Sequence, residues 1–278
     1  MRAVEVPGPS HLEAAWKAVR RSLQVTPVVA VPQLGSSVSV KVETVQPTGS
    51  FKVRGGVAAV AATHEDDPGR AVVASSAGNH GLGLAFAASN LGAQVTVVVP
   101  TGASAAKVSA LQQFDVRLVL YGEGYREAET HALDLAAREG SRYVSPYNDP
   151  DVIAGQATLV RELAEQVPDL GTVVVPCGGG GLLSGVILGL EGRGVRVVGV
   201  ESEASPSMST ALAAGAIVPI NVDPTVADGL AGNLEPGAVG VAALRSGLLT
   251  PDPDGRETVV ILTGRNVAPK LLSEVLHS

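Results

Sequence analysis

The sequence predicts an α/β fold of two domains, each a mainly parallel, twisted sheet with helices on both faces. One observation is a series of short apolar runs typical of buried strands, at residues 71–74, 95–99, 116–120, 172–175, 195–200 and 258–262. Another is that a helical pattern of apolar residues follows each of the first five runs. Apolar strands separated by helices are typical of parallel sheets buried on both faces. At 278 residues and 45% apolar content, the chain can bury one or two full cores.

The N-terminal part is expected to be a helix followed by short strands. Ser10-His11-Leu12-Glu13 has the pattern of a capping box, which predicts a helix that begins there and runs to about Leu23. Short β runs begin at Val28, and an apolar alternation at residues 38–42 predicts a strand. A Pro/Gly-containing turn at residues 47–50 ends this strand before the next helical pattern begins.

Lys52 is expected in the first turn of that helix, with Ser50 as the N-cap. A cation is poorly placed there, because the free N–H groups and the dipole make this end of a helix positive. Such a position is one way to obtain a nucleophilic amine. The plain alternative is a solvated surface lysine, which is the usual fate of lysine.

Two glycine-containing loops favour the interpretation of Lys52 as a nucleophile over that of a surface lysine. Each loop lies between a predicted strand and a predicted helix. The first is residues 75–81, and the second consists of four successive glycines, Gly178, Gly179, Gly180 and Gly181. Successive glycines cost backbone entropy, and they are useful where main chain must closely approach a ligand. A helix N-terminus with free amides is an anion site. The second loop is neither a dinucleotide fingerprint nor a P-loop.

Composition excludes several classes of protein. The net charge of −7 without basic clusters argues against nucleic acid or an anionic membrane as the partner. There is no apolar run of transmembrane length and no basic-then-apolar start, so a cytoplasmic location is expected. The single cysteine, Cys177, fits a reducing compartment and is expected to fill space behind the glycine loop rather than act as a nucleophile.

Four motifs together resemble the pyridoxal-phosphate-dependent serine/threonine dehydratase family, which shares the fold of tryptophan synthase β. They are S-F-K-V-R-G at residues 50–55, S-A-G-N-H-G at 76–81, G-G-G-G-L at 178–182 and L-T-G-R-N at 262–266. The resemblance implies a large domain of residues 1–50 and 149–278, a small inserted domain of residues 51–148, and pyridoxal phosphate in the cleft between them. It also implies a homodimer that acts on a small amino acid.

The resemblance assigns roles to individual residues. Lys52 would form the Schiff base with the cofactor aldehyde and, once displaced by an amino acid, would take the Cα proton. Phe51 would line the cofactor and Asn79 would hydrogen-bond its 3′-oxygen. Thr263 would face the pyridine nitrogen with a neutral hydroxyl, which favours rapid β-elimination over a long-lived carbanion. The backbone amides that would bind its phosphate are those of Gly178, Gly179, Gly180 and Gly181.

The substrate would bind at the loop before the second helix of the inserted domain. Its contacts would come from Ser76, Ala77, Gly78, Asn79 and His80. Related serine racemases carry a serine at the position of Ala77 as the acid and base on the opposite face, and a methyl group cannot do that work. Dehydration of L-threonine or L-serine is therefore favoured over racemisation. The alternative for this loop is an ordinary capped β–α turn.

Glu201, Ser205 and Ser207 follow the run at 195–200 with a spacing that resembles the family's cation site. Divalent-binding members have a carboxylate at the position of Ser207. A neutral serine oxygen there suits a weakly bound monovalent ion such as K⁺. The alternative is a polar loop ahead of a helix.

One departure from the family leaves other functions open. The family has several dozen residues between two segments that here run together at residues 233–242. We therefore expect a gap in space between two consecutively numbered residues within 233–241. If the piece is truly absent, the chain could be an inactive cofactor-binding relative. Another open alternative is a dehydratase for 3-hydroxyaspartate, for which Arg265 is the one local candidate to bind a second carboxylate.

Overall fold

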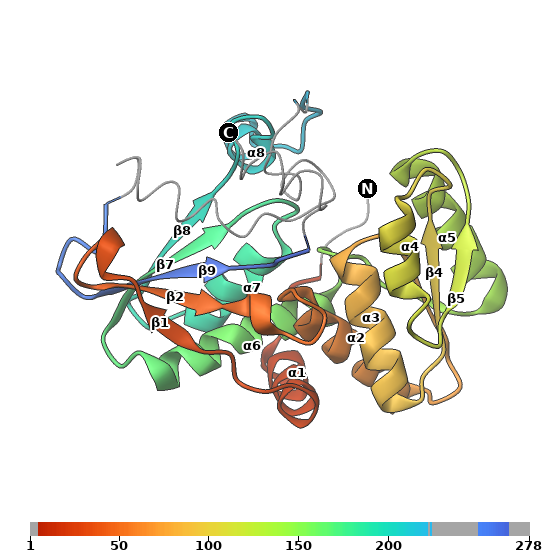
Figure 1. Cartoon of the computed structure of the whole chain (residues 1–278), viewed down its shortest axis with the longest axis horizontal. Coiled ribbons are helices and arrows are strands. Elements are labelled where there is room, and N and C mark those ends of the chain that lie inside the picture. Colours follow the sequence, from red (N-terminus) through yellow and green to blue (C-terminus); the bar gives the residue numbers. More distant parts are fainter. Residues whose placement is uncertain (1–4, 222, 224–249, 267–278) are drawn as a thin grey trace. The chain divides into compact units, whose positions relative to one another are not determined.

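The computed structural model describes residues 5–221, 223 and 250–266 (Figure 1). The α-helices are α1 (Pro9–Ser22), α2 (Lys52–Asp66), α3 (Asn79–Leu91), α4 (Ala105–Leu111), α5 (Tyr125–Glu139), α6 (Pro150–Gln166), α7 (Gly181–Leu190) and α8 (Ser207–Ala214). The strands are β1 (Val28–Ala30), β2 (Val38–Val42), β3 (Val72–Ser75), β4 (Val95–Val99), β5 (Arg117–Leu120), β6 (Arg142–Tyr143), β7 (Leu170–Pro176), β8 (Arg196–Val200) and β9 (Glu257–Leu262). Short 3₁₀ turns η1 (Pro32–Leu34) and η2 (Glu43–Val45) flank β2.

The predicted α/β fold class is confirmed, and each predicted strand is present with small shifts at its ends. The predicted capping box at Ser10 is wrong. Helix α1 begins at Pro9 with Gly8 as its N-cap, and His11 Nδ1 accepts the Gly8 N–H at 3.3 Å. Proline suits the first helical position because its fixed φ is helical and its missing N–H is not needed there. The spatial gap expected within residues 233–241 lies outside the described residues.

The chain divides into two compact units. One comprises Met1–Gln24 and Lys52–Thr158, and the other comprises Val25–Phe51 and Leu159–Ser278. The predicted division differs in residues 1–24 and 149–158, which it placed with the large domain, and in residue 51, which it placed with the small one. Residues 1–24 group with the first unit because α1 packs along α2, where Ala15 contacts Ala58 and Ala154 in one small apolar cluster. Among the helices that the structure describes, none is long and apolar enough to cross a membrane.

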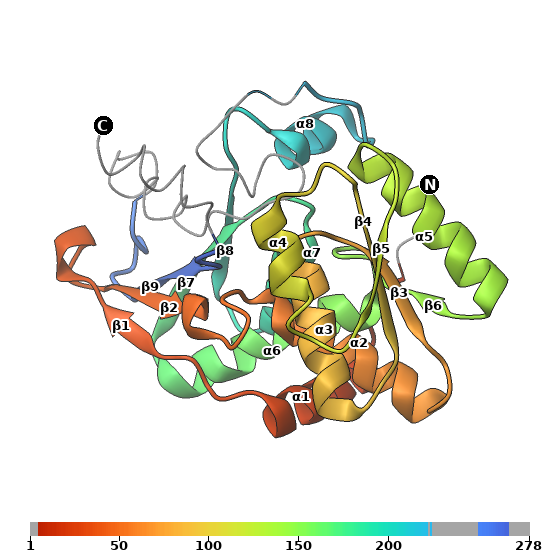
Figure 2. The same cartoon turned by 45° about the vertical axis from the view of Figure 1, so that its right-hand side comes forward.

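The sheet of the first unit has the strand order β5-β4-β3-β6, and all its strands are parallel. Neighbouring residues of a strand point to opposite faces. Val72 and Ala74 therefore pack with the apolar side chains of α2 and α3, whereas Val73 packs with those of α5. Figure 2 shows α5 and α3 on opposite sides of these strands. Helices on both faces explain why the strands are apolar throughout.

The sheet of the second unit has the strand order β1-β2-β9-β7-β8, in which only the β1–β2 pair is antiparallel. The last described strand, β9, lies between β2 and β7 (Figure 1). Val173 and Ile261 pack on one face with apolar residues of α6 and α7. Val174 and Val260 are buried on the other face with Val38. The N-terminal strands of this unit thus pair with its C-terminal strand.

Glycines allow α2 to contact α3 and α6 backbone to backbone. A Cβ added to Gly56 would lie 2.5 Å from the carbonyl carbon of Gly83 in α3. A Cβ added to Gly155 in α6 would lie 2.6 Å from the Arg54 carbonyl oxygen. On the α3 side, a Cβ at Gly83 would also lie 2.9 Å from the Lys52 carbonyl oxygen. No side chain fits at these positions, so the helix that begins at Lys52 is held by contacts that require glycine.

Replacing Gly56 by alanine tests this close packing. The substitution should stabilise α2 through helix propensity and destabilise its contact with α3 through steric overlap. Intrinsic helix propensity favours alanine over glycine by ~1 kcal/mol. We expect the added methyl group to force α2 and α3 apart and to lower the free energy of unfolding by about 1–3 kcal/mol. Urea denaturation measures the change. Gly69→Ala is the matched control, since its added Cβ would lie 3.5 Å from the nearest atom. A Gly56→Ala variant as stable as the wild type would contradict the close approach.

Candidate functional site

Lys52 is the first residue of α2, as predicted, and its side chain is half-buried. The helix begins one residue later than an N-cap at Ser50 would place it. The Lys52 Nζ donates a hydrogen bond to the main-chain carbonyl oxygen of Pro146 at 3.2 Å. Lys52 is therefore not a freely solvated surface lysine, because its amine is directed at a fixed acceptor within its own unit.

The loop at Ser76–Gly78 connects β3 to α3, and α3 begins at Asn79 with Gly78 as its N-cap. The Ser76 amide donates to the Val98 carbonyl oxygen of β4 at 3.2 Å. The Ser76 hydroxyl accepts the Gly78 N–H at 3.2 Å, which gives this loop its shape before any ligand is bound. Asn79 is 9% exposed at the head of the helix. The loop thus presents a helix N-terminus, where an anion is favoured.

His80 follows Asn79 and is 2% exposed. Its Nε2 lies 3.1 Å from the Val144 carbonyl oxygen, and since a carbonyl only accepts, Nε2 carries the hydrogen. Burial, and secondarily the positive charge of Lys52, lowers the pKa of His80 from 6.5 to about 3. The imidazole is therefore neutral at physiological pH. Within the described residues its Nδ1 has no hydrogen-bond partner.

In the second unit, a buried ion pair fixes the start of the segment that leads to Lys52. Lys41 Nζ lies 2.6 Å from Glu162 Oε2, and both side chains are fully buried. Glu43, in η2, accepts hydrogen bonds from Thr26 Oγ1 at 2.6 Å and from Gln46 Nε2 at 3.1 Å. Buried charges persist only when they are paired and hydrogen-bonded. This network therefore fixes the chain where it leaves β2.

Residues 49–51 pair with the chain that follows β9. The Phe51 N–H donates to the Thr263 carbonyl oxygen at 2.9 Å, and the Arg265 N–H donates to the Gly49 carbonyl oxygen at 3.0 Å. Ser50 forms an isolated antiparallel bridge with residue 264 between these two bonds. Thr263 is 2% exposed. Two sequence motifs that are 212 residues apart thus lie against each other immediately before Lys52.

The glycine loop connects β7 to α7, as predicted, but its four glycines do not have equivalent positions. Gly178 and Gly180 are half-buried, Gly179 between them is exposed, and Gly181 is buried as the first residue of α7. Gly180 has φ +83°, a left-handed conformation that favours glycine. The first amides of a helix have no partner within the helix, so those at the start of α7 are N–H donors at its positive end. Gly179 differs from the others because it lies at the tip of the turn, before the helix begins.

Cys177 lies behind this loop and is buried. Burial, together with the charge of Glu201, raises the pKa of its thiol to about 11. The thiol is therefore protonated at physiological pH, whereas a nucleophilic cysteine needs the thiolate. A protonated, buried thiol agrees with the prediction that Cys177 fills space behind the glycine loop.

Glu201 and Ser207, two of the three predicted cation ligands, lie together at the start of α8. The Glu201 carboxylate accepts the Met208 N–H at 2.6 Å and the Ser209 N–H at 2.8 Å, and it lies 3.4 Å from Ser207 Oγ. Ser205, the third, is buried in the preceding turn. In the described part of the chain, no group of three or more His, Cys, Asp or Glu residues could hold a metal ion. The carboxylate therefore caps the helix in this structure.

Each unit, taken by itself, carries features suited to binding a small charged molecule. The first has an amine at the head of α2 and an anion-favouring helix start at α3, whereas the second has the glycine loop at α7 and the Thr263 segment. Free amides at a glycine loop without acidic side chains fit a phosphate group. A half-buried lysine at a helix start fits an aldehyde. An α/β fold with these features is that of an enzyme of pyridoxal phosphate.

The chain belongs to the pyridoxal-phosphate dependent enzyme family, whose model matches residues 19–264. It is 34% identical to an L-threonine ammonia-lyase of Thermotoga maritima over 87% of this chain and 70% of that protein. It is 36% identical to an L-threonine ammonia-lyase of Geobacter sulfurreducens over 77% of this chain, which spans about half of that protein (54%). The processed form of threonine deaminase isoform 2 from Solanum lycopersicum superposes with a TM-score of 0.82 at 26% identity, over 99% of this chain and 90% of that one.

The alignment with the Thermotoga protein is longer than this chain. It is 285 positions long, which exceeds the 278 residues of this chain, so the relative contains residues with no counterpart here. The relationship to the family holds despite this difference in length.

Sequence reasoning missed the contribution of residues 142–149. Pro146 accepts the Lys52 amine and Val144 accepts the His80 imidazole, both through main-chain oxygens. A backbone acceptor leaves no mark on residue type, so the chain offers no motif for it. The one signal available was the pair of acidic residues around Pro150, which is typical of a capped helix start.

The buried neutral His80 predicts a pH-dependent stability. An unfolded histidine protonates near pH ~6.5, whereas folded His80 stays neutral down to about pH 3, so the unfolded state binds the extra proton between these values. His80 should therefore lower the free energy of unfolding by about 2 kcal/mol as the pH falls from 7 to 5. Urea denaturation at both values measures this loss.

His80→Gln should remove most of that loss, and His64→Gln, on the half-buried part of α2, should retain it. If His80→Gln and the wild type lose the same stability between pH 7 and 5, folded His80 is not held neutral.

Proposed function

We propose that the chain catalyses the elimination of water from L-threonine or L-serine, which gives 2-oxobutyrate or pyruvate together with ammonia. The observation that carries this proposal is the Lys52 amine at the head of α2, in a chain of the pyridoxal-phosphate family whose relatives include L-threonine ammonia-lyases. The water lost from the β-carbon is regained when the resulting imine is hydrolysed, so the net products are the 2-oxo acid and ammonia.

Lys52 has two tasks in this proposal. Its amine would hold the cofactor through the aldehyde, and as a free amine it would take the proton from Cα of the substrate. The position of Lys52 at the first residue of α2 supports this role, since the positive end of the helix dipole disfavours a cation there. Pyridoxal phosphate, when bound, supplies a conjugated ring that withdraws electrons from the bond to be broken at Cα.

Other residues of the first unit bind and orient the substrate. The Ser76–Gly78 loop, which includes Ala77, receives the substrate carboxylate at the N-terminus of α3. Asn79 binds the 3′-oxygen of the cofactor. His80, the second residue of α3, borders the substrate at the N-terminus of this helix.

Residues of the second unit bind the cofactor. Phe51 would line the ring of the cofactor. The hydroxyl of Thr263 would meet the pyridine nitrogen as a neutral group that does not hold it protonated, which would favour fast expulsion of the β-hydroxyl. The exposure of Gly179 supports a role of its amide in phosphate binding, because a ligand from solution can approach it. The phosphate is bound by the amides of Gly178, Gly179, Gly180 and Gly181.

Three further properties belong to the proposal. A weakly bound monovalent cation such as K⁺ takes oxygens of Glu201, Ser205 and Ser207, which the proximity of Glu201 and Ser207 supports. The enzyme is a homodimer. It works in the cytoplasm, a location that the single, buried Cys177 supports because reducing compartments do not favour disulfides.

Lys52→Ala tests the proposed function directly. The wild type mixed with pyridoxal phosphate should show the visible absorbance band of the lysine-linked cofactor and should convert L-threonine to 2-oxobutyrate. The variant should lose the band and lower kcat by at least about a thousandfold, because both tasks of the amine are removed. Its unfolding midpoint should stay close to that of the wild type. Lys17→Ala, on the exposed face of α1, is the control that should keep both band and turnover.

If Lys52→Ala keeps the elimination activity of the wild type, the proposed role of Lys52 is wrong. A wild type that shows the band and yet forms no 2-oxo acid would instead identify an inactive cofactor-binding relative.

Ala77 predicts the outcome with L-serine. Because its methyl group cannot donate or accept a proton, protonation from the opposite face should be rare, and the products should be pyruvate and ammonia with little D-serine. Chiral chromatography of the reaction mixture measures the ratio. Ala77→Ser should raise the share of D-serine. Comparable yields of pyruvate and D-serine from the wild type would show that another group protonates the second face.

A further inference from the structure

The acceptor of the Lys52 amine lies in an irregular loop. Residues 144–149 connect β6 to α6, and the Pro146 carbonyl oxygen that accepts from Lys52 Nζ is near their middle. A loop carbonyl can direct a side chain only if other contacts fix the loop, since loops lack the ladder of bonds that holds a strand. The contacts that fix this loop are therefore part of what orients Lys52.

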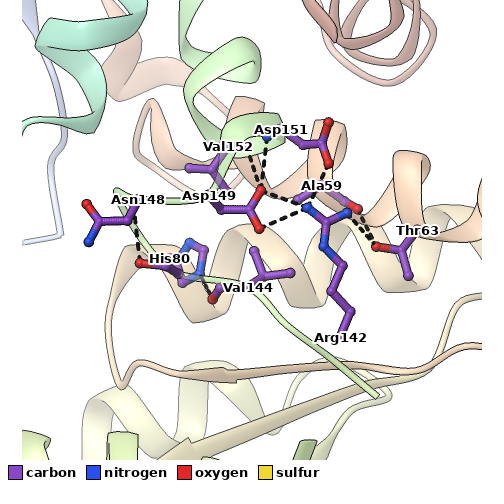
Figure 3. A network of polar contacts seen from close by, with 10 residues as sticks. Ala59, Thr63, His80, Arg142, Val144, Asn148, Asp149, Asp151 and Val152 are labelled. Carbon is purple, nitrogen blue, oxygen red and sulfur yellow. Dashed lines mark hydrogen bonds and ion pairs between the residues drawn. The ribbon is translucent and has the colours of Figure 1, made fainter. Parts of the chain in front are cut away.

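An ion pair closes the base of the loop. Arg142, the first residue of β6, donates through Nη2 to both carboxylate oxygens of Asp149 at 2.9 Å and to Asp151 Oδ2 at 2.7 Å (Figure 3). The Arg142 side chain is 19% exposed and that of Asp149 is 7% exposed. Burial lowers the pKa of Arg142, but the Asp149 and Asp151 carboxylates together outweigh this effect and raise the pKa above its ordinary value, so the guanidinium stays charged. Charge-assisted bonds that are largely buried are the strong ones.

The same two residues connect the loop to the elements around it. Asp149 Oδ1 accepts the N–H groups of Asp151 and Val152 at 3.0 and 3.2 Å, which caps the start of α6. Arg142 Nη1 donates to Thr63 Oγ1 at 3.1 Å, and Thr63 belongs to α2. Helix α2 is thus bonded to this segment at both ends, through Lys52 at its first residue and through Thr63 in its last turns.

Two bonds within the loop complete its support. His80 Nε2 donates to the Val144 carbonyl oxygen at 3.1 Å, and the Ser145 hydroxyl accepts the Asn148 N–H at 3.3 Å (Figure 3). The carbonyl groups on both sides of residue 145 are therefore engaged, one by His80 and one by Lys52. The orientation of the Pro146 peptide follows from contacts made by Arg142, Asp149 and His80.

We propose that Arg142 is a positioning residue for the reaction: through its ion pair with Asp149 it holds the Pro146 carbonyl where it fixes the Lys52 amine in its unlinked state. The proposal rests on the proposed role of Lys52. Once Lys52 has lost its proton, an amine that donates one N–H to a carbonyl has its lone pair directed away from that oxygen. The nitrogen is thus held ready to accept a proton or to attack an aldehyde, and a fixed reacting group saves the entropy of orientation.

Arg142→Gln tests the proposal with two readouts. The first is the rate at which the visible band appears when pyridoxal phosphate is added to the full chain, and it should fall about tenfold because the amine is no longer placed in advance. The second is turnover of L-threonine, in which kcat should fall about tenfold while KM changes less than about twofold. Arg142→Lys keeps one charged contact and should recover part of both losses.

Two further variants separate this role from general stability. Arg117→Gln removes an exposed ion pair with Glu139 in the same unit and should leave both readouts unchanged. If Arg142→Gln does not fold, Asp151→Asn removes one arm of the network and should change both readouts in the same direction, by less. A folded Arg142→Gln with wild-type rates would overturn the proposal. So would an equal effect in Arg117→Gln, or a loss confined to KM.

Failure of the proposed function gives a different pattern. A wild type that gains the visible band but does not consume threonine refutes the dehydratase, whereas the rate of band formation in Arg142→Gln still decides whether Arg142 positions the amine.

Discussion

The approach of α2 to α3 and α6 is the constraint on which the rest of the first unit depends. Gly56 and Gly155 leave no room for a side chain at the two contacts, so the three helices have one packing distance. Because Lys52 is the first residue of α2 and its carbonyl oxygen lies against Gly83, this distance also places the proposed catalytic amine. A glycine retained within a helix against its low propensity thus has a functional consequence.

In the second unit, tertiary contacts likewise fix the segment that directly precedes Lys52. The buried Lys41–Glu162 ion pair holds the segment that leaves β2, and the bonds of residues 49–51 to Thr263 and Arg265 hold its end. These bonds exist because β9 is inserted between β2 and β7. Thr263, which is proposed to tune the cofactor, is therefore hydrogen-bonded through its backbone to the residues that directly precede Lys52.

Local sequence patterns predicted the elements better than their termini. Each apolar run became a strand, and both glycine loops lie between a strand and a helix as expected. The predicted start of α1 at Ser10 was wrong because proline favours the first helical position. The helix therefore begins at Pro9, with Gly8 as an N-cap that has no side chain. The grouping of residues 1–24 with the first unit was not predicted either, since it depends on the contact of Ala15 with α2. Nor could four identical residues in a row predict that Gly179 alone is exposed, because exposure depends on where α7 begins.

The sequence by itself determined the residue types on which the proposed chemistry depends. The lysine at a helix start, the successive backbone amides of the glycine loop and the methyl group of Ala77 are all set by residue type and its immediate neighbours. Only the tertiary structure decided what orients that chemistry. The Lys52 amine meets the Pro146 carbonyl oxygen 94 residues later, and Arg142 bonds to Thr63 across 79 residues. The acceptors in these two contacts are a backbone oxygen, which every residue has, and one threonine hydroxyl, which is too common a group to form a motif. Their positions follow from helix packing and strand order, which no local pattern records.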